Sequence, residues 1–405
     1  MTLSAKALFL ALAIFGHLGL WNGLTNRLHG TGLGRWKMKA ITQVLRTILV
    51  LGPLAYVWLW LWHGAPGPLD FRPDSESLVV SADEGRLLVA YGALCSATAV
   101  VFYPLWWRDF RRKRPQFLDS RRIVIDMYDD LGVRPVAGVW AGAWSRLPGN
   151  QFLAPEAVEH RLEVPRLPRA LDGLTVVHLT DLHLSGRVTL PYYRRAMRQV
   201  AEWEPDLVII TGDLCEHARN IPGIAEIVDL APAREGKFYL LGNHDLRTKN
   251  VPALRAALAA VGCEDLGGAW RELSIRGTRV LLGGDQRPWF SPPLDPTLAG
   301  PRAPGAAELR IVGLHSPDRV SVARAADADL ALAGHTHGGQ IRLPVIGAIV
   351  CPSLFGLRYN AGLYDESPTL LYVTRGLCSL TPVRLNCRPE LARFELRCPP
   401  ERAAT

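Results

Sequence analysis

Gly242-Asn243-His244-Asp245 and Gly334-His335-Thr336-His337 are the longest of five short polar patches that decide the interpretation of this chain. The other three are Asp181-Leu182-His183, Gly212-Asp213 and His315. Each patch follows a short apolar run typical of a strand. Their carboxylate, amide and imidazole groups, without a thiolate, suit a hard or borderline divalent ion. There are enough of them for two ions that share one carboxylate, which is a common device for displacement at phosphorus.

The apolar runs before the patches predict an α/β domain. Segments 191–203 and 252–261 predict helices, the first with Pro191 in its first turn. Strands that alternate with helices place ligands on loops at the strand carboxyl ends. The predicted strands, buried on at least one face, are 174–180, Leu207–Thr211, 238–241, 280–282, 309–314 and Leu330–Ala333.

The spacing inside the patches bears on metal binding. Asp181 and His183 are two residues apart, and extended backbone would point both side chains the same way, so that both could reach one ion. His335 and His337 repeat this spacing. Asp213 has two oxygens with which it could bridge two ions.

Each polar residue also has a simpler explanation when it is taken alone. An Asp at a strand end is usually a turn or cap residue, and a lone His such as His315 is more often a polar surface or core residue than a ligand. All of these explanations would have to hold at once, which the fixed order of the patches makes improbable.

In their order DxH, GDxx, GNHD, H and GHxH, the patches resemble the signature of the calcineurin-like metallophosphoesterase superfamily. Segments 334–344, GHTHGGQIRLP, and 371–389, LYVTRGLCSLTPVRLNCRP, resemble a membrane-linked phosphodiesterase branch that includes a UDP-2,3-diacylglucosamine hydrolase. The likeness covers about residues 155–398. Cys378, where the branch often has Gly, and Leu246, where an aromatic residue is common, depart from the pattern and bear on substrate fit.

The resemblance implies two facing mixed β-sheets flanked by helices over residues 170–398. It also implies two divalent ions, manganese first, with iron, zinc or cobalt as alternatives. His244 would contact the phosphoryl oxygen or protonate the leaving oxygen, and Asp245 would orient His244. The implied metal ligands are Asp181, His183, Asp213, Asn243, His315, His335 and His337.

Residues 1–110 predict a membrane region with helices at 5–24, 41–62 and 87–107. The last has no charge and ends in aromatic residues, as a bilayer span does. A signal peptide is the alternative for the first segment, and a buried core helix for the second. Lys and Arg follow the first and third segments, whereas acids follow the second. This asymmetry predicts a multi-pass inner-membrane protein with its catalytic domain in the cytoplasm.

The remaining composition narrows the class of protein. The chain has a hydrophobic content of 48% and a net charge of +8. The basic residues cluster beside the apolar runs, without a nucleic-acid motif, so no nucleic-acid partner is expected. The seven Cys are scattered and form no CxxC pair, which argues against a disulfide framework or structural zinc site and mildly favours a reducing compartment. Segment 111–169 is expected to be a connector.

Three functions fit these features. The first is a membrane-anchored dimetal hydrolase of a phosphodiester or pyrophosphate bond, with a nucleotide-linked lipid such as UDP-diacylglucosamine as substrate. The second is a phosphatase of a soluble phosphate ester with a simple membrane anchor, and the third is a non-catalytic signalling or partner-binding protein, which the complete ligand set opposes. Insertion 285–309, with Trp289 and Phe290, is either an apolar lid or an ordinary variable loop.

Overall fold

The computed structural model describes residues 2–62, 82–110, 114–302 and 307–400, and the chain forms two compact units. The helical unit comprises Met1–Lys113 together with Leu354–Arg358. The sheet unit comprises Arg114–Ser353 and Tyr359–Thr405.

The helical unit contains three helices that are long and apolar enough to cross a membrane. They are α1 (Leu3–His29), α2 (Arg35–Trp62) and α3 (Ala82–Phe110), and they contain the predicted segments 5–24, 41–62 and 87–107. All three are longer than predicted because polar residues such as Arg27, Lys37 and Glu84 continue each helix beyond the apolar run.

Glycine and one buried histidine explain how these three helices pack. A Cβ on Gly16 would lie 1.6 Å from the carbonyl oxygen of Cys95, so α1 and α3 approach too closely for any side chain there. His17 of α1 contacts the Tyr91 hydroxyl of α3 through Nδ1, and its Nε2 lies 3.0 Å from the Ile48 carbonyl oxygen of α2. One imidazole therefore joins all three helices.

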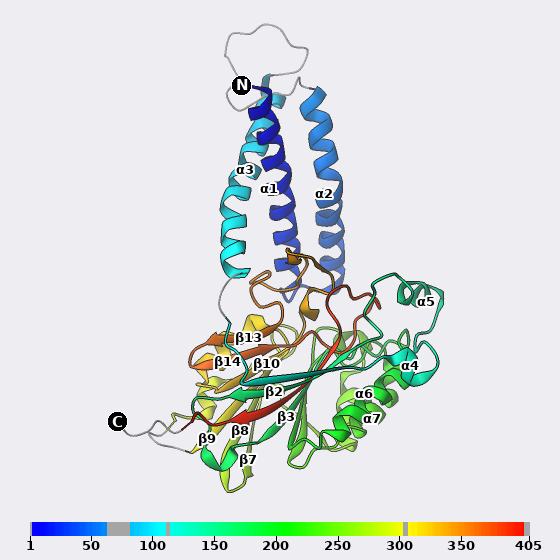
Figure 1. Cartoon of the computed structure of the whole chain (residues 1–405), viewed down its shortest axis with the longest axis vertical. Helices are drawn as coiled ribbons and strands as arrows, with labels where there is room; N and C mark the ends of the chain where they lie inside the picture. Colours follow the sequence, from blue (N-terminus) through cyan, green and yellow to red (C-terminus); the bar gives the residue numbers. More distant parts are fainter. Residues whose placement is uncertain (1, 63–81, 111–113, 303–306, 401–405) are drawn as a thin grey trace. The chain divides into compact units, whose positions relative to one another are not determined.

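The sheet unit is built on two large mixed sheets (Figure 1). The seven-stranded sheet has the order β1 (Asp119–Val124), β2 (Glu156–Glu163), β15 (Glu390–Arg397), β3 (Thr175–Leu179), β4 (Leu207–Thr211), β5 (Gly236–Leu240) and β6 (Cys263–Asp265). The six-stranded sheet has the order β13 (Gly362–Glu366), β14 (Thr369–Val373), β10 (Leu330–Ala333), β9 (Glu308–Leu314), β8 (Thr278–Asp285) and β7 (Trp270–Ile275).

Alternate residues of the strands fill separate cores. Ile209 and Ile311 lie in the apolar layer between the two sheets, whereas Ile210 packs under helices α6 (Leu190–Glu202), α7 (Ile221–Asp229) and α8 (Val251–Ala260). The outer face of the six-stranded sheet is covered by α9 (Val320–Ala325). The predicted fold of two facing mixed sheets flanked by helices is confirmed.

All six predicted strands and both predicted helices are present, but segment 111–169 is not a connector. It supplies β1 and β2, and β2 pairs with β15 along eight residues in parallel. Because this partner comes from the far end of the chain, local sequence gives no sign of it. The sheet unit therefore begins well before residue 170.

The topology brings the five patches to one edge. Strands β3, β4 and β5 are parallel neighbours, as are β8, β9 and β10. Their carboxyl ends meet at the same edge of each sheet, and every patch follows one of these ends. The two sheets face each other, so the patches from both converge.

Candidate metal centre

The backbone at five of the seven candidate ligands lies in the left-handed region. The strands before the first and last patches end at Leu179 and Ala333, so the expectation that extended backbone aligns the pairs is wrong. Such φ values are uncommon outside glycine and cluster at functional sites. The φ angles are 54° at Asp181, 45° at His183, 54° at Asp213, 67° at His335 and 51° at His337.

Despite this, Asp181, His183 and His337 form one compact group, with a ligand atom from each within 4.8 Å of the others. The Oδ1 atom of Asp181 lies 3.7 Å from Nε2 of His183 and 3.6 Å from Nε2 of His337. Its Oδ2 accepts the backbone N–H of His335 at 3.0 Å. The free oxygen of Asp181 therefore points at two imidazole nitrogens.

Asp213, His315 and His335 form a second group by the same criterion. Oδ1 of Asp213 lies 3.3 Å from Nε2 of His315, and Oδ2 lies 3.5 Å from Nε2 of His183 in the first group. Asn243 joins the second group, with its Oδ1 3.0 Å from Nε2 of His315. The carboxylate of Asp213 thus lies between the two groups.

The chemistry of these atoms fits divalent metal ions. Asp181 Oδ1 and His335 Nε2 are buried and have no hydrogen-bond partner in the part of the chain that the structure describes. A buried polar atom or charge without a partner costs free energy, and a cation would satisfy both atoms. Carboxylate, amide and imidazole donors suit manganese, iron, zinc and cobalt, and do not distinguish among them.

The pKa values of the ligands are strongly shifted, and not all in the same direction. Burial opposes ionisation of Asp213, but the charges of His315 and His244 outweigh it and hold the pKa of this carboxyl well below its ordinary value. Burial lowers the pKa of His335 to about 3, and it also lowers the pKa of His337. Burial opposes the protonated form of His315 as well, but the charge of Asp213 outweighs it and raises the pKa of this ring to about 9, and neighbouring carboxylates likewise raise the pKa of His183 against the effect of burial. Because neutral imidazoles and ionised carboxylates are the forms that bind metals, these two rings would lose a proton when an ion binds.

Glu216 is an essential part of this site that the sequence reasoning missed. Its Oε1 lies 2.7 Å from Nδ1 of His183 and 2.6 Å from Nδ1 of His244. Its Oε2 accepts a hydrogen bond from Arg247 at 2.7 Å. A carboxylate at Nδ1 fixes the tautomer and leaves Nε2 free for a ligand or substrate. The sequence offers one sign of this role, which is the position of Glu216 three residues after the ligand Asp213.

Asp245 does not have the orienting role that was predicted for it. Its Oδ1 accepts the backbone N–H groups of Leu214 and Cys215 at 2.9 and 3.0 Å, and its Oδ2 accepts that of Gly242 at 2.8 Å. Asp245 therefore ties together the loops after β4 and β5. The carboxylate that contacts His244 is Glu216.

Arg384 and the insertion with Trp289 and Phe290 also lie around the metal ligands. The buried guanidinium of Arg384 donates to the carbonyl oxygen of His337 at 2.8 Å, and another of its nitrogens lies 3.3 Å from Nδ1 of that ring. Trp289 of the insertion lies with its ring centroid 5.2 Å from that of His315 and 4.9 Å from that of His335. Phe290 packs against the helix-covered core. The insertion therefore shields the second group of ligands.

We predict that Glu216→Gln lowers Mn²⁺ affinity roughly 10–100-fold, the usual effect of losing a carboxylate that orients a ligating histidine. Calorimetric titration of the metal-free protein measures this affinity. Glu226→Gln is the matched control, because Glu226 is exposed and pairs only at the surface with Arg194. Equal affinities of the two variants would show that Glu216 does not orient the metal ligands.

Comparisons with known proteins agree with the site. The family model described as calcineurin-like phosphoesterase matches residues 174–339. The phosphodiesterase YaeI of Escherichia coli is 32% identical over 252 residues, which cover 60% of this chain and 88% of that protein. A transmembrane protein with metallophosphoesterase domain from Danio rerio is 30% identical over 264 residues, 61% of this chain and 59% of that protein.

A third relative carries a more specific name. The UDP-2,3-diacylglucosamine pyrophosphatase LpxG of Chlamydia muridarum is 26% identical over 285 residues, 56% of this chain and 85% of that protein. The residues that the family model matches contain the strands that bear the two ligand groups. The phosphodiesterase YaeI is matched over 88% of its length at 32% identity. The chain therefore belongs to the calcineurin-like phosphoesterase family and is a metal-dependent phosphoric ester hydrolase.

Proposed function

We propose that the chain is a membrane-anchored dimetal phosphoesterase that hydrolyses a phosphodiester or pyrophosphate bond in a lipid-linked substrate. One observation carries the dimetal part of this proposal. The two oxygens of Asp213 face different histidines, at 3.3 Å from His315 and 3.5 Å from His183, so that one carboxylate can serve two ions.

The ligands divide between two sites. Two divalent ions bound there supply Lewis acidity at the phosphoryl group and lower the pKa of an attacking water. Manganese is the expected metal, with iron, zinc and cobalt as alternatives. One site is assigned Asp181, His183, His337 and Asp213, and the other Asp213, Asn243, His315 and His335.

His244 is assigned to the substrate. Its Nδ1 is held by Glu216, and its backbone N–H donates to Asp213 at 2.7 Å, so the ring is fixed beside the ligands. Its side chain is 14% exposed, whereas the neighbouring His183 is 1% exposed. The free Nε2 can therefore donate to a phosphoryl oxygen or protonate the leaving oxygen.

The two roles predict different mutant behaviour. Asp213→Asn should abolish turnover and reduce the content of both metals, because one carboxylate serves both sites. His244→Ala should keep nearly normal metal content and lower kcat by roughly 10²–10⁴, the usual effect of losing a positioned acid–base group. Metal analysis of the purified variants measures their metal content, and hydrolysis of a chromogenic phosphodiester measures their turnover. Equal metal loss in both variants would contradict the division of roles.

Two observations support a lipid-linked substrate. The chain carries three candidate membrane helices, and LpxG is named for a pyrophosphate bond in a diacylated nucleotide sugar. The rival is a phosphatase of a soluble ester, for which the helices would be an anchor only. A non-catalytic protein of this fold would not need the full set of ligands and their orienting carboxylate.

A pair of matched substrates decides between the lipid and the soluble reading. UDP-2,3-diacylglucosamine and UDP-N-acetylglucosamine contain the same pyrophosphate but differ in their long acyl chains. Burial of apolar chain stabilises by about 0.8 kcal/mol per methylene group, so two buried methylenes suffice for about a tenfold preference in kcat/KM. We predict at least this preference for the acylated substrate with the full chain in detergent. Equal kcat/KM values would contradict the lipid-linked substrate.

The charges at the ends of the three helices predict which side of the membrane each part of the chain faces. Arg27, Arg35, Lys37 and Lys39 lie at the adjoining ends of α1 and α2, and residues 111–114 are all Arg or Lys, whereas acids outnumber bases in 63–81. Positive segments stay in the cytoplasm, which places the N-terminus outside the inner membrane and the sheet unit inside. We predict that a fluorescent protein fused to the C-terminus matures and that an alkaline phosphatase fusion there is inactive. The reverse result would contradict the orientation.

A further inference from the structure

We propose that two exposed apolar segments of the sheet unit form a docking rim for the surface of an anionic lipid bilayer. The first segment is helix α5 (Val139–Ser145), and the second is the hairpin of β11 (Arg342–Leu343) and β12 (Gly347–Ala348). The proposal rests on the proposed function, which it deepens by assigning the surface through which a bilayer-borne substrate reaches the metal ligands.

Helix α5 exposes large apolar side chains. Val139 is 86% exposed and Trp140 is 76% exposed. Trp144 is also exposed and lies four residues after Trp140, so both rings lie on the same face of the helix. Tryptophan is enriched at the level of lipid headgroups because its ring is apolar and its N–H is polar. This face therefore has the chemistry of a membrane interface.

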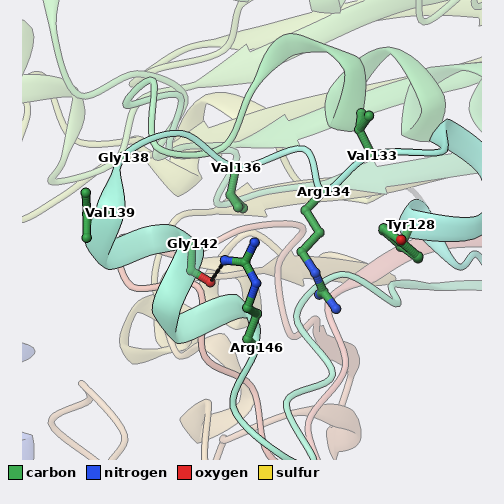
Figure 2. Close-up of a pocket in the computed structure, with 8 residues that line it drawn as sticks. All are labelled: Tyr128, Val133, Arg134, Val136, Gly138, Val139, Gly142 and Arg146. Carbon is green, nitrogen blue, oxygen red and sulfur yellow. Dashed lines mark hydrogen bonds between the residues drawn. The ribbon is translucent and has the colours of Figure 1, made fainter.

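A positively charged cavity adjoins the same helix. Figure 2 shows Arg134 and Arg146 in this cavity of about 720 Å³. Arg146 donates to the carbonyl oxygen of Gly142 at 2.8 Å, and Arg134 donates to that of Ser145 at 3.2 Å. Neither forms an ion pair in the described part of the chain, although Arg134 lies over the ring of Tyr128 at 5.1 Å. Asp129 and Asp130, the acids nearest in sequence, do not line the cavity, and Asp130 pairs with Arg195. Guanidinium groups beside tryptophans complement the phosphates of anionic lipids.

The hairpin carries the second half of the rim. Val345, at its tip, is 80% exposed, and Leu343, Ile346 and Val350 are exposed beside it. The hairpin is fixed to the last metal-binding patch, because Arg342 donates to the carbonyl oxygen of Gly338 at 2.8 Å. These apolar side chains therefore project from a base that is rigidly connected to His337.

One segment joins the two halves. Asn150 donates to the carbonyl oxygens of Trp144 at 2.8 Å and Pro382 at 2.7 Å, which ties α5 to residues 382–385. The backbone N–H of Arg342 donates to the carbonyl oxygen of Leu385 at 2.9 Å, which ties the hairpin to the same segment. Between these contacts lies Arg384, which bonds His337. Both halves are thus fixed to one buried segment that also bonds the last metal-binding patch.

A bilayer is the occupant that these features favour over a protein partner. The chain has three candidate membrane helices of its own, and α5 begins 29 residues after the end of α3 (139 − 110). Exposed tryptophans flanked by unpaired arginines match lipid headgroups, whereas a protein partner would require a specific acidic surface.

The experiment uses the full chain, reconstituted into vesicles of equal parts phosphatidylglycerol and phosphatidylcholine. Val139→Cys and Val345→Cys carry a fluorescent label, and nitroxide groups on lipid acyl chains quench it. Six of the seven native cysteines are buried, and Cys398→Ser removes the partly exposed one. Leu230→Cys is the matched control, because Leu230 is an exposed apolar residue before β5, at the edge opposite the metal centre.

We expect quenching at Val139 and Val345 several-fold stronger than at Leu230. Quenching at Val139 and Val345 that is no stronger than at Leu230 would overturn the rim. Protection of both labels from lipid nitroxide and also from aqueous iodide would overturn it too, because it would indicate that a protein covers this surface. Arg134→Gln with Arg146→Gln should remove the extra quenching that phosphatidylglycerol gives over phosphatidylcholine alone. If the protein with both arginines intact were quenched equally in vesicles with and without phosphatidylglycerol, the assignment of these arginines to lipid phosphates would be overturned.

The readout separates this inference from the proposed function, because lipid contact is measured without turnover. Failure of the rim with normal preference for the acylated substrate would leave the function standing. Lipid contact without any phosphoesterase activity would remove the function and leave the surface. Trp140→Ser with Val345→Ser should lower hydrolysis of a vesicle-borne substrate several-fold and leave hydrolysis of a water-soluble phosphodiester unchanged. Equal losses on both substrates would overturn the role of the rim in substrate access.

Discussion

The constraint on which this molecule depends is the burial of two carboxylates, Asp181 and Asp213, whose oxygens lie 3.7 and 3.5 Å from the same nitrogen, Nε2 of His183. Both are at most 1% exposed, and like charges removed from water are costly unless cations or hydrogen-bond donors surround them. The fold meets this demand at the price of backbone strain, with left-handed φ at both residues. It also requires a glycine, because a Cβ on Gly242 would lie 2.2 Å from Oδ1 of Asp213.

Much of this arrangement could be predicted from local sequence. The strands Leu207–Thr211 and Leu330–Ala333 lie where their apolar runs placed them, since buried strands are continuous apolar segments. The ligands converge because parallel strands present their carboxyl ends at one edge. What failed depends on contacts distant in sequence. The pairing of β2 with β15 has no local signal, and the exposed, polar β1 does not resemble a buried strand.

The same limit explains the exchange of roles between Asp245 and Glu216. Both are acidic residues close to ligands in the sequence, and only the folded loops decide which carboxylate faces His244 and which accepts backbone N–H groups. Trp289 is a further example, because its loop is a variable insertion in sequence but packs on two imidazoles in the structure. Side chains that orient or shield ligands are recruited through space, so motif spacing finds ligands more readily than their supports.

Whether one carboxylate joins two ions is tested most directly by electron paramagnetic resonance of the purified, Mn²⁺-loaded chain. Two manganese ions bridged by Asp213 predict an exchange-coupled spectrum with closely spaced hyperfine lines in the wild-type protein. Asp213→Asn loaded under the same conditions should show at most the signal of isolated manganese. A fully occupied wild-type protein whose spectrum contains only isolated manganese would contradict the shared carboxylate and the dimetal centre built on it.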